Sequence, residues 1–133
     1  IKNAEAIISI DARGFIFGSA ISLLASKPMI VARKPGKLPG ELVGKSYSLE
    51  YGENTLSIQK KAFKKYRSYA IVDDLLATGG TVNCVSKILE SNNKEIVGAL
   101  VVIELLKLEG KSNLDLPVES MISLWRVGII YYI

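Results

Sequence analysis

The residues best suited to chemistry lie in one short stretch, AIVDDLLATGGTV, at positions 70–82. Two adjacent carboxylates, Asp73 and Asp74, stand at the end of an apolar run, and a loop of small residues follows. Because Gly79 and Gly80 carry no side chain, the backbone N–H groups of this loop can turn inward towards an anion. The loop leads into a predicted helix, whose unpaired N–H groups and dipole also favour negative charge.

This small-residue loop predicts a site for one phosphate monoester. Its members are Ala77, Thr78, Gly79, Gly80 and Thr81. The two threonines add hydroxyl donors, and the preceding aspartates are acceptors suited to sugar hydroxyls or to the shell of a magnesium ion. A Walker-type loop needs a lysine that this stretch lacks, and residues 11–18 do not form the dinucleotide fingerprint G-x-G-x-x-G.

Positive charge is concentrated in residues 27–67. This segment holds ten lysines and arginines against three glutamates, whereas the whole chain has a net charge of +4. A local positive field suits a polyanionic ligand. Aromatic residues are not interleaved with the cations as a single-strand nucleic-acid binder requires. We therefore expect a small phosphorylated ligand rather than nucleic acid.

The composition is typical of one globular domain. The 133 residues are 49% hydrophobic and 23% charged, and runs such as VGALVVI are too short to cross a bilayer. With no histidine and a single cysteine, Cys84, the chain has neither zinc nor histidine chemistry, and acid–base work falls to carboxylates, lysine or tyrosine. A reducing, cytoplasmic setting fits. The sequence begins without methionine and runs at once into a strand, so we expect a fragment that lacks its N-terminus.

Apolar runs alternate with helical patterns, and this alternation must position the candidate residues. We expect buried strands at 5–10 and 69–74, further strands at 28–33, 95–105 and 118–124, and helices at 15–26 and 81–92. A hairpin is expected over 45–58 with its turn at 51–54. Residues 59–68 form a solvated basic segment or a short helix, and 110–117 a loop. Such βαβ units predict an α/β fold with a central, mostly parallel sheet flanked by helices. The loops at 11–14 and after Asp74 would both lie at the carboxyl ends of strands, where ligands of these sheets bind.

The two carboxylates followed by TGGT resemble the ribose-5-phosphate motif of the type I phosphoribosyltransferases. The segments ARGFIFG, ARKPGKLPGE, YSLEYG and IELLKLEGK are similar to segments of that family in the same order, and they look most like the members that act on adenine. The resemblance covers residues 5–124. It implies the type I phosphoribosyltransferase fold in a single domain, 1–133, with a flexible loop and hairpin lid at 34–58.

The resemblance also implies an activity. Family members of this kind transfer a phosphoribosyl group from 5-phosphoribosyl-1-pyrophosphate to adenine, giving AMP and pyrophosphate in purine salvage. It implies a homodimer, no nucleic-acid or membrane partner, and Mg²⁺ that the substrate carries, with contact to Asp73 or Asp74 only through water. The alternatives are another purine phosphoribosyltransferase, for xanthine or guanine, and a non-catalytic regulator that senses phosphoribosyl pyrophosphate. The family's adenine-recognising residues precede this segment, so none is assigned.

Two groups of residues would hold the phosphoribosyl part of the substrate, by resemblance to the family. The 5-phosphate would lie against the loop residues Ala77, Thr78, Gly79, Gly80 and Thr81. Asp73 and Asp74 would lie along the ribose hydroxyls and act in catalysis by stabilising positive charge that grows on the ring.

Basic residues would hold the pyrophosphate, again by resemblance. Arg13 would meet it in the tight loop after the first strand, where Gly14 permits close backbone approach. Further cations would close on it from the Pro/Gly-rich loop: Arg33, Lys34 and Lys37. Glu50 would handle the purine proton as a catalytic residue, and Tyr51 beside it would belong to the lid.

Overall fold

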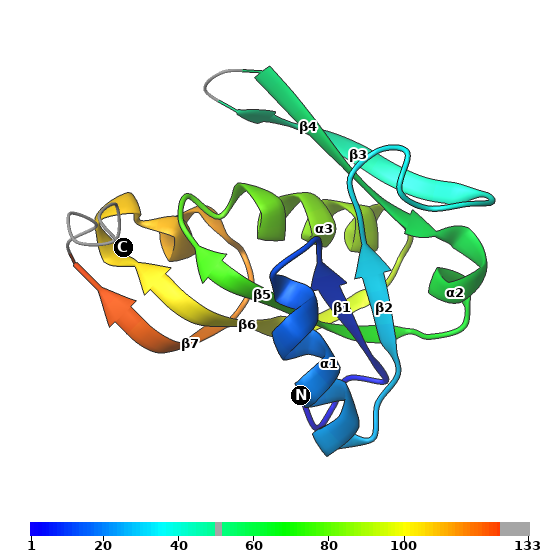
Figure 1. The fold of residues 1–133 in the computed structure, drawn as a ribbon, viewed down its shortest axis with the longest axis horizontal. Coiled ribbons are helices and arrows are strands. Elements are labelled where there is room, and N and C mark those ends of the chain that lie inside the picture. The colour runs from blue at the N-terminus through cyan, green and yellow to red at the C-terminus, as the bar shows by residue number, and fades with distance from the viewer. Residues whose placement is uncertain (50–51, 126–133) are drawn as a thin grey trace.

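The computed structural model of the chain describes residues 1–49 and 52–125, with backbone alone at 45–49 and 52–54. Five of the described strands form one sheet in the order β2-β1-β5-β6-β7, and every neighbouring pair is parallel (Figure 1). These strands are β1 (Ala6–Ile10), β2 (Met29–Ala32), β5 (Ser68–Leu76), β6 (Glu95–Leu105) and β7 (Val118–Leu124). The expected α/β fold with a central parallel sheet is confirmed.

The neighbouring strands β1 and β5 are largely apolar because helices cover both faces of the sheet there. All five residues of β1 are buried, and so are the first six of β5. Helix α1 (Gly14–Ala25) packs on one face and helix α3 (Gly80–Ser91) on the other. Since alternate residues of a strand point to opposite faces, Ile8 faces α3 while Ser9 faces Gly18 of α1.

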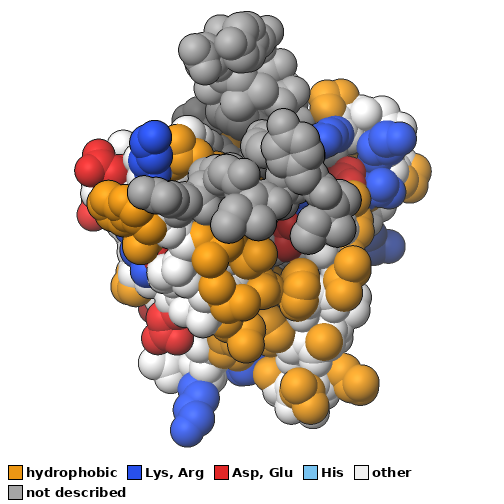
Figure 2. Space-filling view, turned by 60° about the vertical axis from the view of Figure 1, so that its left-hand side comes forward, with side chains coloured by type: hydrophobic (Ala, Val, Ile, Leu, Met, Phe, Trp, Pro, Cys, Tyr) orange, Lys and Arg blue, Asp and Glu red, His pale blue; other side chains and the backbone are white. Residues whose placement is uncertain are grey.

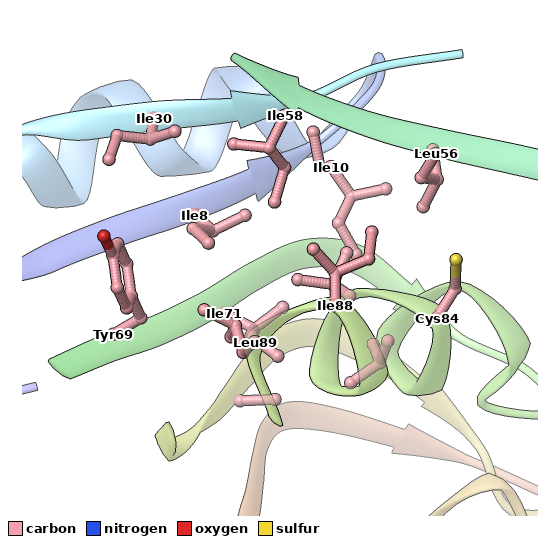
Figure 3. Close-up of a cluster of buried hydrophobic side chains, with 14 of the residues drawn as sticks. Ile8, Ile10, Ile30, Leu56, Ile58, Tyr69, Ile71, Cys84, Ile88 and Leu89 are labelled. Atoms are coloured by element: carbon pink, nitrogen blue, oxygen red, sulfur yellow. The ribbon is translucent and has the colours of Figure 1, made fainter. Parts of the chain in front are cut away.

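Helix α3 is amphipathic and supplies five of the 18 buried residues of the main core cluster. Its buried side chains recur at the spacing of one helix face, as Val82, Val85, Ile88 and Leu89. Figure 3 shows Ile88 and Leu89 lying against Ile71 of β5, with Ile8 of β1 beyond it. Burying an aliphatic side chain of this size contributes about 1.5–3 kcal/mol, so this packing holds α3 against β1 and β5.

A separate antiparallel hairpin consists of β3 (Leu42–Leu49) and β4 (Gly52–Gln59). Leu56 and Ile58 of β4 are buried and join the main core. The turn predicted at residues 51–54 is wrong, because the ladder that starts at Leu42 and Gln59 continues until Gly52 pairs with Leu49. The hairpin itself is confirmed.

Strand β5 is longer than the sequence predicts. The expected strand end at Asp74 is wrong, because Leu75 and Leu76 still pair with Ile103 and Glu104 of β6. Both aspartates therefore stand on a strand that is paired on either side of them, and the loop begins only after Leu76.

Short helical segments complete the described part. The basic segment after the hairpin forms α2 (Lys60–Lys64), whose Phe63 is buried and stacks on Tyr69 with ring centroids 5.6 Å apart. Two 3₁₀ turns follow β6, η1 (Leu106–Leu108) and η2 (Gly110–Asn113), the second inside the predicted loop. Among the described helices, none has the length and apolar character needed to cross a membrane.

Candidate active site

An open cleft of about 440 Å³ lies at the carboxyl ends of β1 and β5. One wall is the segment after β1, with Ile10, Asp11, Ala12 and Arg13. The other wall is the end of β5 and the loop that follows, with Asp73, Asp74, Leu75, Ala77, Thr78, Gly79, Gly80 and Thr81. Lys34 also lines the cleft; it belongs to the Pro/Gly-rich segment after β2 with Arg33 and Lys37, called the basic loop below. The parallel pairing of β1 with β5 brings these two segments together across some sixty residues of sequence, as the position of the loops predicts.

Asp73 is held inside the cleft wall. The residue is 7% exposed, and its carboxylate accepts hydrogen bonds from the backbone N–H of Asp74 at 2.9 Å and from Thr81 Oγ1 at 3.4 Å. Burial raises the pKa of Asp73 to about 7, and the neighbouring Asp74 carboxylate adds to this rise, although the N–H bond opposes it. Asp73 therefore changes its charge near neutral pH.

Asp74 faces the opposite wall and pairs with Arg13. The guanidinium Nε of Arg13 donates to Asp74 Oδ2, and this hydrogen bond raises the pKa of the arginine further above its usual value. Arg13 is 73% exposed, so its remaining N–H groups stay open to solvent. The next residue, Gly14, allows this approach, because a Cβ there would stand 3.0 Å from Asp73 Oδ1 and 3.2 Å from the Val72 carbonyl.

The loop from Ala77 to Thr81 turns sharply into α3. Gly79 has φ +87°, a conformation that favours glycine, and its carbonyl accepts the first helical N–H from Asn83 at 2.8 Å. A Cβ on Gly79 would also lie 2.9 Å from the carbonyl oxygen of Gly110. Glycine is therefore required here for conformation and for space, and the open helix end lines the cleft.

The structure brings only part of the predicted basic group to the cleft. Arg33 is turned towards Asp11, with Nε 3.2 Å from Asp11 Oδ2, and its guanidinium carbon lies 5.6 Å from the centre of the Phe15 ring. Of these three predicted cations, Lys34 lines the cleft, whereas Arg33 and the exposed Lys37 are not among the described residues that line it.

Glu50 and Tyr51, predicted as a catalytic residue and a lid residue, fall outside the described residues. Nothing in the geometry of the cleft tests them, so both stay predictions.

Asp11 is a cleft residue that sequence reasoning did not single out. Its side chain is 7% exposed, lines the cleft, and accepts from Arg33 and, at 3.4 Å, from the backbone N–H of Lys34. Its position directly after a buried strand could have marked it as a site residue. The same position led the sequence analysis to select Asp73 and Asp74. Its partners lie more than twenty residues away, so its role follows only from the folded chain.

A comparison with known families places the chain. The sequence pattern of the phosphoribosyl transferase domain matches residues 2–128. The chain belongs to this family, and the expected kinship with the type I phosphoribosyltransferases is confirmed. The paired carboxylates, the TGGT loop and the helix N-terminus that the family resemblance singled out all meet in the one cleft.

Several similar relatives are adenine phosphoribosyltransferases. That of Prochlorococcus marinus (strain MIT 9515) is 79% identical over 123 residues, covering 92% of this chain and 72% of the relative. That of Mycoplasmopsis synoviae (strain 53) is 45% identical, covering 91% and 73%. The crystal structure of the Thermoanaerobacter pseudethanolicus adenine phosphoribosyltransferase is 37% identical with a TM-score of 0.86, covering 92% and 72%. The Saccharomyces cerevisiae enzyme, solved with a 1,6-bisphosphate imino sugar and adenine, is 32% identical with a TM-score of 0.82, covering 90% and 68%.

Proposed function

We propose that this chain transfers the phosphoribosyl group of 5-phosphoribosyl-1-pyrophosphate to adenine, giving AMP and pyrophosphate. One observation carries the proposal: the TGGT loop and the Asp73–Asp74 pair line one cleft in a chain 79% identical to an adenine phosphoribosyltransferase. This is the activity that the sequence resemblance implies.

The 5-phosphate binds at the loop from Ala77 to Thr81. Its backbone N–H groups and the N-terminus of α3 supply donors and a favourable dipole for a dianion. The hydroxyls of Thr78 and Thr81 add further donors. This end of the substrate is fixed by groups that carry no net charge, so the phosphate is recognised by the shape of the loop.

Asp73 and Asp74 act on the ribose. Their carboxylates accept hydrogen bonds from the ribose hydroxyls and lie beside the ring as its carbon gains positive charge on departure of pyrophosphate. Asp73 must be ionised for this work, and its pKa of about 7 makes donor binding sensitive to pH near neutrality. A ribose hydroxyl that donates to Asp73 favours the ionised form.

The pyrophosphate binds at the opposite wall, where Arg13 and Lys34 supply cations and Gly14 permits close backbone approach. Arg13 is already paired with Asp74, so pyrophosphate takes over N–H groups of a cation that is held in place. Arg33 and Lys37 join from the basic loop once it closes, as the family resemblance implies.

Mg²⁺ fits this site as a companion of the substrate. The described residues hold no cluster of three or more metal-ligating side chains, and magnesium is commonly held by one or two carboxylates together with substrate phosphates and water. Asp73 and Asp74 are the carboxylates that would contact it, through water. When bound, the ion neutralises charge on the pyrophosphate leaving group.

A lid over the cleft belongs to the same proposal. Residues 34–58 would close on the substrate and exclude water, with Glu50 at the purine proton and Tyr51 beside it. The base of this segment is anchored, because Arg33 and Ser57 exchange two backbone hydrogen bonds of 2.9 and 2.8 Å. An anchored base is what a lid hinged at this end needs.

We further propose that the chain acts as a homodimer in the cytoplasm. Support for the dimer comes from large apolar side chains left exposed on one helix and one edge strand. They are Ile16, Leu23 and Leu24 of α1, and Met121 and Ile122 of β7. Figure 2 shows hydrophobic side chains gathered on one face of the molecule. Exposed apolar surface of this kind is typical of contact sites.

The single buried cysteine supports the cytoplasmic location, because it fits a reducing compartment.

The decisive experiment is a product assay of the full-length protein with adenine, hypoxanthine, guanine and xanthine, each offered with 5-phosphoribosyl-1-pyrophosphate and Mg²⁺. We expect AMP from adenine and little product from the other bases. Turnover of guanine or xanthine instead would support the other purine specificity. Tight binding of the donor without product from any base would identify a sensor and overturn the enzyme proposal.

A further inference from the structure

The loop of residues 77–81, called the phosphate loop below, is covered on its outer side by the segment that follows β6. The η2 turn packs so closely that a Cβ on Gly110 would collide with the carbonyl of Ala77. The side-chain amide of Asn113 donates a hydrogen bond of 3.0 Å to the carbonyl oxygen of Thr78. Gly110 and Asn113 do not line the cleft, so they touch the loop from the side away from the ligand.

We propose that Asn113 is a positioning residue for phosphate binding, which holds the Thr78–Gly79 peptide so that its N–H faces the cleft. In a trans peptide the C=O and N–H groups point in opposite directions, and the Thr78–Gly79 bond is trans. Fixing the Thr78 carbonyl towards Asn113 therefore directs the Gly79 N–H to the other side, where Thr78 and Gly79 line the cleft.

This peptide needs an outside partner because glycine leaves it free to rotate. Gly79 can adopt positive and negative φ at similar cost, so the peptide before it has two accessible orientations. In the reversed orientation a carbonyl oxygen would point at the bound phosphate and repel it. The amide of Asn113 stabilises only the orientation in which that carbonyl points outward.

Asn113 can act in this way because its own segment is fixed. Lys111, two residues earlier, pairs with Glu104 of β6 at 2.7 Å, and that carboxylate is 6% exposed. Glu104 also accepts from Ser120 Oγ of β7 at 2.8 Å. Lys111 and these hydrogen bonds lower the pKa of Glu104, so its carboxylate stays ionised at neutral pH. The turn that carries Asn113 is thereby tied to two strands of the central sheet.

The inference rests on the proposed function only in that the loop binds a 5-phosphate. The test compares N113A with N92A, because Asn92 donates the same kind of bond to the Ile88 carbonyl, at 2.8 Å, at the far end of α3. Ribose 5-phosphate and pyrophosphate are titrated separately into each purified variant by calorimetry. Thermal unfolding without ligand is measured alongside.

We expect N113A to weaken ribose 5-phosphate about fivefold, the loss of one ordinary hydrogen bond's net contribution, and to leave pyrophosphate affinity unchanged. N92A should leave both affinities unchanged, with a similar small drop in unfolding temperature. In turnover, N113A should raise the KM for the donor with kcat nearly constant.

Three outcomes would contradict the role of Asn113 or the proposed function. Equal ribose 5-phosphate affinities for N113A and N92A would overturn the role of Asn113 and leave the proposed function standing. Parallel losses of ribose 5-phosphate and pyrophosphate affinity would reveal a general disturbance and overturn it too. A parent chain that binds neither ligand would overturn the proposed function itself.

Discussion

The two ends of the cleft are built in different ways. The phosphate loop, residues 77–81, offers backbone N–H groups that are held from outside by the η2 turn. The opposite end offers the charged side chains of Lys34 and of Arg13, which is already paired with Asp74. Arg33, which does not line the cleft, is paired with Asp11. The first end is uncharged and held from outside, whereas the second is charged, with part of its charge already paired within the protein.

Under the proposed function, this difference indicates how each end would recognise its part of the substrate. The loop loses little conformational freedom when phosphate binds, so binding there depends on shape. At the other end an incoming pyrophosphate competes with carboxylates for the same cations. Because Arg13 is largely exposed, its pair with Asp74 contributes little on its own and is easily exchanged. Changes to the loop should therefore be severe, and changes to single cations mild.

The largest effect is expected from Gly79→Val. Valine disfavours φ +87°, and its Cβ would lie 2.9 Å from the Gly110 carbonyl, so the loop must rearrange. Affinity for ribose 5-phosphate should fall at least about a hundredfold, measured by calorimetry. Gly40→Val is the matched control, because Gly40 has φ +80° with nothing within 4 Å. If the first variant binds as the control does, the loop is not the phosphate site.

Asp74→Asn should affect catalysis and pyrophosphate binding in different ways. The amide loses the charge beside the ribose, so kcat/KM should fall about 10–100-fold, equivalent to about 1.4–2.7 kcal/mol of transition-state stabilisation. The change also weakens the hold on Arg13, so pyrophosphate affinity should hold or rise. Steady-state kinetics and pyrophosphate titration measure the two quantities. Unchanged kinetics would reject the assignment of Asp74.

Asp73 lies between the ends and should make stability depend on pH. Folding raises its pKa from 3.8 to about 7, so in that interval the folded chain holds one more proton than the unfolded chain. The free energy of unfolding should therefore decrease as pH rises from about 4 to about 7, by at most about 1.4 kcal/mol per pH unit from this group. Urea unfolding of the parent chain and of Asp73→Asn measures this slope, which the variant should reduce.

Glu104→Gln is the control for the pH experiment. The pKa of Glu104 is lowered from 4.5, so its stabilisation is lost only as pH falls below that value. Its replacement should lower stability but leave the slope between about pH 5 and 7 unchanged. A parent chain with no negative slope in that window would contradict the raised pKa of Asp73.

The smallest effects are expected from single cations of the basic loop. Lys34→Ala should weaken pyrophosphate about threefold, since one exposed charge contributes well under 1 kcal/mol. Arg33→Ala should weaken it less, because Arg33 must first leave Asp11 and the face of Phe15. Titrations at low and high salt measure both. A larger loss for Arg33→Ala would show that the basic loop reorganises fully around pyrophosphate.

The sequence predicts the sheet well for a clear physical reason. Strands covered on both faces must be continuous apolar runs, and such runs are visible without a structure. The predicted limits of β6, 95–105, agree with the observed strand. Those of the exposed edge strand β7, 118–124, agree as well. The hairpin turn is misplaced because residues 52–54 are poor strand formers locally, yet the ladder extended from Leu42 includes them.

The site is only half visible in the sequence. Gly79 and Gly80 interrupt a helix start, and the paired aspartates are costly on a strand, so both are conspicuous locally. Asp11 and Asn113 are not, because their bonds join positions 22 and 35 residues apart. Sequence spacing singled out groups that we propose touch the ligand. The groups that hold them in place depend on tertiary packing.

The pairing of β1 with β5 has a consequence for how the chain folds. Glu5, just before β1, bonds to Ser68 at the start of β5, 63 residues away, whereas the β3–β4 hairpin closes between Leu49 and Gly52. Contacts between remote positions form slowly, because a long loop must be closed before they stabilise anything. The cleft walls are the ends of β1 and β5, so the cleft arises only with this remote pairing. A chain with its hairpin formed and β5 undocked would have no place for a phosphate, and ligand binding would report the completed fold.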